Sequence, residues 1–183
     1  VFNLLHRQVS PQTVYKFQEL DQDDVIDITE FDVIAWVKAE MRIMLDEEIA
    51  RAILIGDGRL YNDKYKIKED NIKPIVNDDD LYNIKVTVTA GLDDAATAKN
   101  AIRAMIKSRK FYKGSGNMVF FTSEDWLSEW LLLEDCFGHE LYKDASDLAK
   151  KLRVNRIVTC PVLEDLTVDG QKVMGIALDL RDY

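Results

Sequence analysis

Residues 29–58 have the sequence TEFDVIAWVKAEMRIMLDEEIARAILIGDG, and this stretch decides the architecture of the chain. It predicts one helix over residues 30–56, about 40 Å long at about 1.5 Å per residue. Thr29 is a preferred N-cap residue, and Asp32 three positions later gives a short version of the capping box. Gly56-Asp57-Gly58 ends the helix, because glycine accepts the positive φ values that follow a helix C-terminus. A helix this long in a small chain is expected to be a scaffold for other elements.

The predicted helix carries two apolar stripes. At about 100° per residue, Trp36, Ile43, Ala50 and Leu54 form a narrow stripe, which charged rows separate from a broad apolar face. A helix on the outside of a monomer needs only one such face. The second stripe indicates either a helix enclosed in its own domain or a contact with another subunit, and Trp36, Ile43 and Leu54 are the candidate interface residues. The broad face contains Val33, Ile34, Val37, Met41, Met44, Leu45, Ala52 and Ile55.

The composition is ordinary for a globular protein and narrows the class of partner. The 183 residues suffice for one domain or two small ones. A formal net charge of −9 argues against sequence-specific nucleic-acid binding, which needs a basic surface. No apolar run approaches the ~20 residues of a membrane span, so no membrane partner is expected. Two cysteines, Cys136 and Cys160, are too few for a disulfide framework and indicate a reducing compartment.

Charge is distributed unevenly along the chain. Residues 17–37 contain seven acids, among them Asp21, Asp23 and Asp24, and no base. Residues 95–123 contain six bases and no acid, and Lys99, Arg103, Lys107 and Lys110 recur at helical spacing. Either each segment is a solvated face, or the acidic segment of one copy docks on the basic helix of the next.

The remaining pattern predicts an α+β protein without internal repeats. Alternation of apolar and polar residues favours strands at 14–20 and 84–89, and a continuous apolar run favours a buried strand at 118–122. Asp93 or Asp94 and Ser123 each cap a predicted helix. Further predicted elements are a helix over 94–110, a helix after 123, a short helix over 145–152, a strand over 156–164, and a hairpin at Asp169-Gly170 between LTV and KVMGIALDL.

Catalytic and metal-binding signals are weak. Cys136 and His139 lie three positions apart, but nothing in the sequence supplies an orienting third group for a nucleophile. Two histidines and two cysteines lack the spacing of a zinc site, and the acids at 21–24 lack the glycine and terminal glutamate of a calcium loop. We therefore expect no catalytic residues, no metal and no cofactor.

Several motifs occur in an ordered series. These are ARAILIGDG at residues 50–58, AIRAMIKSRKFYKGSGNMVFFTSEDW at 101–126, LLLEDCFGHELY at 131–142 and, after a short helix, RIVTCPVLE at 156–164. In this order the chain resembles the major capsid proteins of tailed bacteriophages, which have the Hong Kong 97 type of fold. The resemblance implies a long spine helix packed on a β-sheet in a peripheral domain, and a mixed α/β axial domain.

The resemblance also implies where these parts lie. Residues 1–90 would be the peripheral domain, with the base of an extended loop up to about Phe17 and the spine helix at 30–56; residues 91–183 would be the axial domain, incomplete at its C-terminus. Family members are usually longer, so a truncated chain is expected, which lacks the N-terminal arm, most of the extended loop and a returning C-terminal strand.

The function implied is that of a major capsid protein of a phage or prophage, without enzymatic activity. Copies would assemble through hexamers and pentamers into an icosahedral shell around the DNA genome, made in the bacterial host cytoplasm and located in the virion capsid. Portal, scaffold or decoration proteins would be further partners. The near alternative is an encapsulin-like compartment protein, and a more distant one is an unrelated α+β enzyme that uses Cys136 or an acidic cluster.

Overall fold

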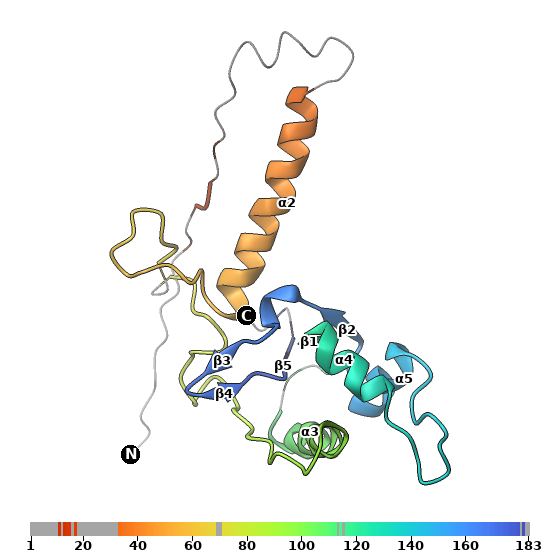
Figure 1. The fold of residues 1–183 in the computed structure, drawn as a ribbon. Helices are drawn as coiled ribbons and strands as arrows, with labels where there is room; N and C mark the ends of the chain where they lie inside the picture. Colours follow the sequence, from red (N-terminus) through yellow and green to blue (C-terminus); the bar gives the residue numbers. More distant parts are fainter. Residues whose placement is uncertain are drawn as a thin grey trace, which may run out of the picture. The chain divides into compact units, whose positions relative to one another are not determined.

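The computed structural model describes residues 11, 13–15, 17, 33–68, 71–112, 114, 116–179 and 181. Helices and strands together make the chain an α+β protein (Figure 1). It divides into two compact units, Val1–Asp79 and Asp80–Tyr183, whereas the sequence placed the division at residues 90 and 91. Residues 80–90 belong with the second unit because Val88 packs against its core and the Asn100 side chain donates a hydrogen bond to the Thr89 carbonyl at 3.1 Å.

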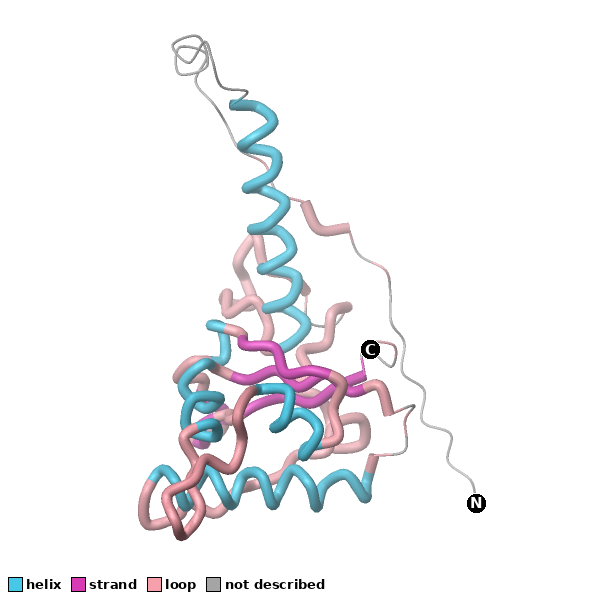
Figure 2. The backbone as a smooth tube through the Cα atoms, turned by 90° about the vertical axis from the view of Figure 1, so that its right-hand side faces the viewer, coloured by secondary structure: helices cyan, strands magenta, loops and turns pink. Residues whose placement is uncertain are grey.

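The long helix α2 spans Val33–Leu54 and is the main element of the first unit. Figure 2 shows it as one uninterrupted helix, and its 22 residues give it a length of about 33 Å. It ends near the predicted residue, since Gly56 and Gly58 adopt φ of 92° and 69°. The predicted cap at Thr29 lies outside the described residues.

The C-terminal end of α2 is tied to a later part of its own unit. The backbone N–H groups of Ile75 and Val76 donate to the carbonyls of Ile53 and Leu54 at 2.9 and 3.2 Å. These carbonyls are among those that a helix cannot satisfy internally. Residues 71–79 therefore complete the helix end by hydrogen bonding.

The sheet that the sequence predicted for the first unit is not formed by its described residues. The first unit contains no strand among its described residues, which are 11, 13–15, 17, 33–68 and 71–79. The expected strand at 14–20 is therefore not seen in the part of it that the structure describes. The expected strand at 84–89 falls in the second unit, and it is wrong because those residues form no strand. Ile84 and Val86 are 50% and 43% exposed there. An alternating pattern favours extended backbone, but a strand also needs a neighbour with which to pair.

The second unit is built on a three-stranded sheet of order β2-β1-β5. The central strand β1 (Met118–Thr122) pairs in parallel with β2 (Arg156–Thr159) and antiparallel with β5 (Gly175–Asp179). Four of the five residues of β1 are buried, which confirms the prediction from its continuous apolar run.

The predicted hairpin at Asp169-Gly170 is confirmed, and two predicted strands are shorter than expected. Both turn residues have positive φ, as a tight two-residue turn requires. The run that follows does not continue as one strand, because pairing in the hairpin ends at Lys172 and the chain pairs with β1 only from Gly175. The strand predicted for 156–164 ends at Thr159, since Pro161 begins a 3-10 helix. The hairpin strands are β3 (Thr167–Val168) and β4 (Gln171–Lys172), and the 3-10 helix is η2 (Pro161–Leu163).

Two helices of the second unit begin at the predicted caps. The Asp93 carboxylate accepts from the Ala96 N–H at 2.6 Å, and the Ser123 hydroxyl accepts from the Trp126 N–H at 3.4 Å. The elements are α3 (Asp94–Ser108), η1 (Arg109–Phe111), α4 (Glu124–Leu131) and α5 (Ala145–Leu152).

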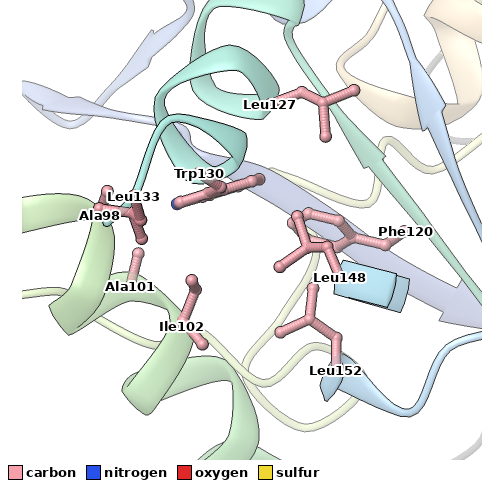
Figure 3. Packing of buried hydrophobic residues seen from close by; sticks show 9 residues of the cluster. All are labelled: Ala98, Ala101, Ile102, Phe120, Leu127, Trp130, Leu133, Leu148 and Leu152. Carbon is pink, nitrogen blue, oxygen red and sulfur yellow. The ribbon is translucent and has the colours of Figure 1, made fainter. Parts of the chain in front are cut away.

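The core of the second unit lies where three helices cover one face of the sheet. Figure 3 shows Trp130 of α4 at the centre of this cluster, with Phe120 of β1 and Leu148 of α5 nearby. Trp130 is fully buried, and its ring centroid lies 5.7 Å from that of Phe120. The other members of the cluster are Ala98, Ala101, Ile102, Leu127, Leu133 and Leu152.

Candidate functional site

The N-terminal two-thirds of α2 expose apolar side chains on opposite sides of the helix. Trp36 and Ile43 of the narrow stripe are 51% and 53% exposed. On the broad face, Ile34 and Met44 are 51% and 47% exposed. Ile34 and Ile43 are nine positions apart, which at about 100° per residue places them on opposite sides. The exposed apolar surface of α2, as we name these four residues, is therefore not a single face.

Leu54, the third predicted interface residue on this helix, belongs to a different environment. It is 5% exposed, and Ala52 beside it is 2% exposed. The narrow stripe is thus exposed to solvent near Trp36 and buried at the C-terminal end of α2. Helical periodicity shows which residues share a stripe, but it does not show where along the helix the stripe becomes covered.

A buried carboxylate organises the loop that follows α2. Asp57 is 5% exposed and accepts hydrogen bonds from the Lys66 ammonium at 2.9 Å, the Ile67 N–H at 2.6 Å and the Arg59 N–H at 3.2 Å. Lys66 also donates to the Arg59 carbonyl at 2.8 Å. These bonds fold residues 57–67 back on the helix end.

The charged form of Asp57 is stabilised where it lies. Burial by itself would raise the pKa of this carboxyl, but the hydrogen bonds from Lys66, Ile67 and Arg59 outweigh burial and hold the pKa below its ordinary value. The sequence predicts a helix stop at Gly56-Asp57-Gly58 and does not predict this inward-turned carboxylate. The overlooked signal was an acid between two glycines, because such an acid can turn inward and accept backbone N–H groups.

The basic residues of α3 border a hollow of about 540 Å³ in the second unit. Lys99 and Arg103 lie on its rim with Lys151 of α5, and Lys99 reaches the Glu134 carbonyl at 3.5 Å. Lys107 is exposed on the same helix and does not line the hollow. The floor is apolar and consists of Ile102, Ile106, Leu133, Leu141 and Tyr142.

The α3 hollow, as we name this site, also contains two acids and a thiol. Glu134, Asp135 and the exposed Cys136 line it from the loop after α4. Burial raises the pKa of Tyr142 on the floor. The sequence predicted the basic stripe but not the hollow, because the loop that forms its other wall lies more than 25 positions further along the chain.

The predicted acidic partner of the α3 stripe lies outside the described residues. Asp21, Asp23 and Asp24 all fall within residues 18–32, of which the structure describes none. The pairing of the acidic and basic segments therefore stays a prediction.

The His139 side chain contacts a carboxylate of its own loop. The His139 imidazole Nδ1 lies 3.5 Å from an Asp135 carboxylate oxygen, and Asp135 also accepts the Phe137 and His139 N–H groups at 2.7 and 3.0 Å. These backbone hydrogen bonds, first that from His139, lower the pKa of Asp135. Burial raises the pKa of Cys160, which disfavours its thiolate. Within the described part of the chain, no group of three or more metal-ligating side chains is found.

Comparisons with models of protein families, with curated proteins and with solved structures find no match to this chain. Among the described residues, no helix has the length and apolar character needed to cross a membrane.

Proposed function

We propose that this chain is a major capsid protein of a tailed phage or prophage, without enzymatic activity, and that its copies assemble into an icosahedral shell around DNA. In this proposal α2 is the spine of a peripheral domain of the Hong Kong 97 type, and the second unit is the axial domain. The protein would be made in the bacterial host cytoplasm and end in the virion capsid, with portal, scaffold or decoration proteins as further partners.

The exposed apolar surface of α2 is the observation that carries this proposal. A surface helix that packs only on its own domain exposes polar residues on its outer side. Here Ile34 and Ile43 are half exposed on opposite sides. Burying one large apolar side chain completely is worth about 1.5–3 kcal/mol, so covering the exposed halves of all four would contribute about 3–6 kcal/mol per helix. This free energy of burial would favour contact between subunits that cover the exposed apolar surface of α2.

The order of the motifs supports the particular class. The long helix that ends in Gly56-Asp57-Gly58 is followed by a helix, the apolar strand β1 and a second helix whose N-cap is Ser123, as in the capsid family that the sequence resembles. A separate second unit with its own core is also what an axial domain requires.

Particle formation by the purified full-length protein tests the proposal. We expect light scattering and negative-stain electron microscopy to show closed shells or large oligomers when a scaffold and a maturation protease are supplied. A protein that stays monomeric over a wide range of concentration and salt under those conditions would refute it. Shells that package a cargo enzyme and no DNA would instead support the encapsulin-like alternative.

A further inference from the structure

The α3 hollow combines an apolar floor with a largely basic rim, and this combination indicates the chemistry of its occupant. Ile106 and Leu141 are 37% and 48% exposed. Lys99 and Arg103 stand beside them, and the opposing wall brings Glu134 and Asp135. An extended segment with several acids and interleaved apolar residues would fit both the floor and the rim.

One segment of this chain has that chemistry. Residues 17–32, which we name the acidic segment, have the sequence FQELDQDDVIDITEFD, with seven acids and no base. Five apolar residues are interleaved among these acids. They are Leu20, Val25, Ile26, Ile28 and Phe31.

We propose that the acidic segment of one copy docks in the α3 hollow of a second copy. The acids would pair with Lys99, Arg103 and Lys151, and the apolar side chains would cover the floor. The proposal deepens the proposed function and rests on it, because it names the surface through which one subunit would hold the next.

Charge complementarity selects the occupant, because the acidic segment has seven acids and no base and Lys99, Arg103 and Lys151 line the hollow. Docking between copies and docking within one chain are separated by the experiment that follows.

The native thiol of Cys136 makes the docking measurable in the full chain. A donor chain carries Asp24→Cys with Cys136→Ser and Cys160→Ser, and an ¹⁵N-labelled acceptor carries Cys160→Ser and keeps Cys136. The two are mixed and oxidised with copper phenanthroline. A second donor with Asp63→Cys in place of Asp24→Cys is the matched control, because Asp63 is an exposed acid in a loop of the first unit.

We expect the donor–acceptor disulfide to form about tenfold faster than the control disulfide, because docking raises the effective concentration of the two thiols. Lys99→Glu with Arg103→Glu in the acceptor should abolish that advantage. Asp21→Lys with Asp23→Lys in the donor should then restore the faster disulfide formation with this charge-reversed acceptor. A misfolded acceptor would give no such recovery.

Two results would overturn the docking. One is a rate equal to that of the control donor. The other is a chain carrying both Asp24→Cys and Cys136 that cross-links within itself at a rate independent of concentration. Shells without the cross-link would refute the docking and leave the capsid proposal standing. Cross-linked dimers without larger particles would support the docking and count against the capsid.

Discussion

Replacing Asp57 by Asn is expected to loosen the C-terminal end of α2 and the loop that follows it. The carboxylate accepts three hydrogen bonds, at 2.6, 2.9 and 3.2 Å, and one of them comes from an ammonium group. Asparagine is neutral and has one acceptor oxygen, so its amide N–H₂ would face a donor. A hydrogen bond to a charged group contributes about 1.5–3 kcal/mol and an unsatisfied buried group costs about 1–3 kcal/mol, so the expected loss of local stability is about 2–4 kcal/mol.

Hydrogen exchange followed by mass spectrometry measures this loss where it should occur. A loss of about 2–4 kcal/mol corresponds to exchange about 30-fold to several hundred-fold faster. The affected amides are those of Ile67, Ile75 and Val76, which are hydrogen-bonded to Asp57 or to the end of α2.

The matched control is Asp63→Asn. Asp63 is exposed and accepts the Tyr65 N–H at 2.8 Å. We expect little change in exchange at residues 67–76 in this variant. Unchanged exchange at Ile67 and at Ile75 in Asp57→Asn would refute the inference that the carboxylate holds the loop.

Three further outcomes follow from the described contacts. Because the folded-state pKa of Asp57 is lowered, its stabilisation is present above the unfolded value of about 3.9 and is lost as pH falls through the folded value. The protection of the Ile67 amide, taken relative to its intrinsic exchange rate at each pH, should therefore fall below about pH 4 in the wild type and much less in Asp57→Asn. Leu148→Ala should lower the free energy of unfolding of the second unit by about 2–5 kcal/mol in urea melts followed by fluorescence, because Leu148 is 0% exposed. Reversing Lys99, Arg103 and Lys107 to Glu should weaken assembly at low salt and much less at high salt, as light scattering would show.

Each of these outcomes has a control and a contradicting result. If acid lowered the protection of Ile67 equally in the wild type and in Asp57→Asn, Asp57 would not be the cause of the pH dependence. Leu132→Ala, at a residue 69% exposed, should change stability by less than about 0.5 kcal/mol, and an equal loss in both leucine variants would contradict the described core. Assembly of the charge-reversed protein that matches the wild type at low salt would show that the basic stripe is only solvated.

Local signals predicted the second unit well. Asp93 and Ser123 cap their helices by accepting backbone N–H groups, and a cap needs only residues within the first turn. The turn at Asp169-Gly170 depends on two residues that accept positive φ. The apolar run of β1 predicted a buried strand because its burial is continuous.

The errors arose where an element depends on a distant partner. Residues 84–89 have the composition of a strand, but no neighbouring strand pairs with them in the described residues, so they form none. Leu54 shares a helical stripe with Ile43, yet only Leu54 is buried, because coverage depends on what packs at the helix end. The α3 hollow joins two segments that periodicity treats separately.

The most direct test of the central claim is the particle mass of a variant with Trp36→Glu and Ile43→Glu. These side chains are half exposed on α2, so two carboxylates there should leave the chain folded and prevent close contact between subunits. The matched control carries Lys38→Glu and Arg42→Glu, at exposed charged positions of the same helix, and changes the net charge more. Sedimentation velocity should show large particles for the wild type and the control, and folded small species for the Trp36 and Ile43 variant. Particles of wild-type mass from that variant would contradict the claim that the exposed apolar surface of α2 joins the subunits.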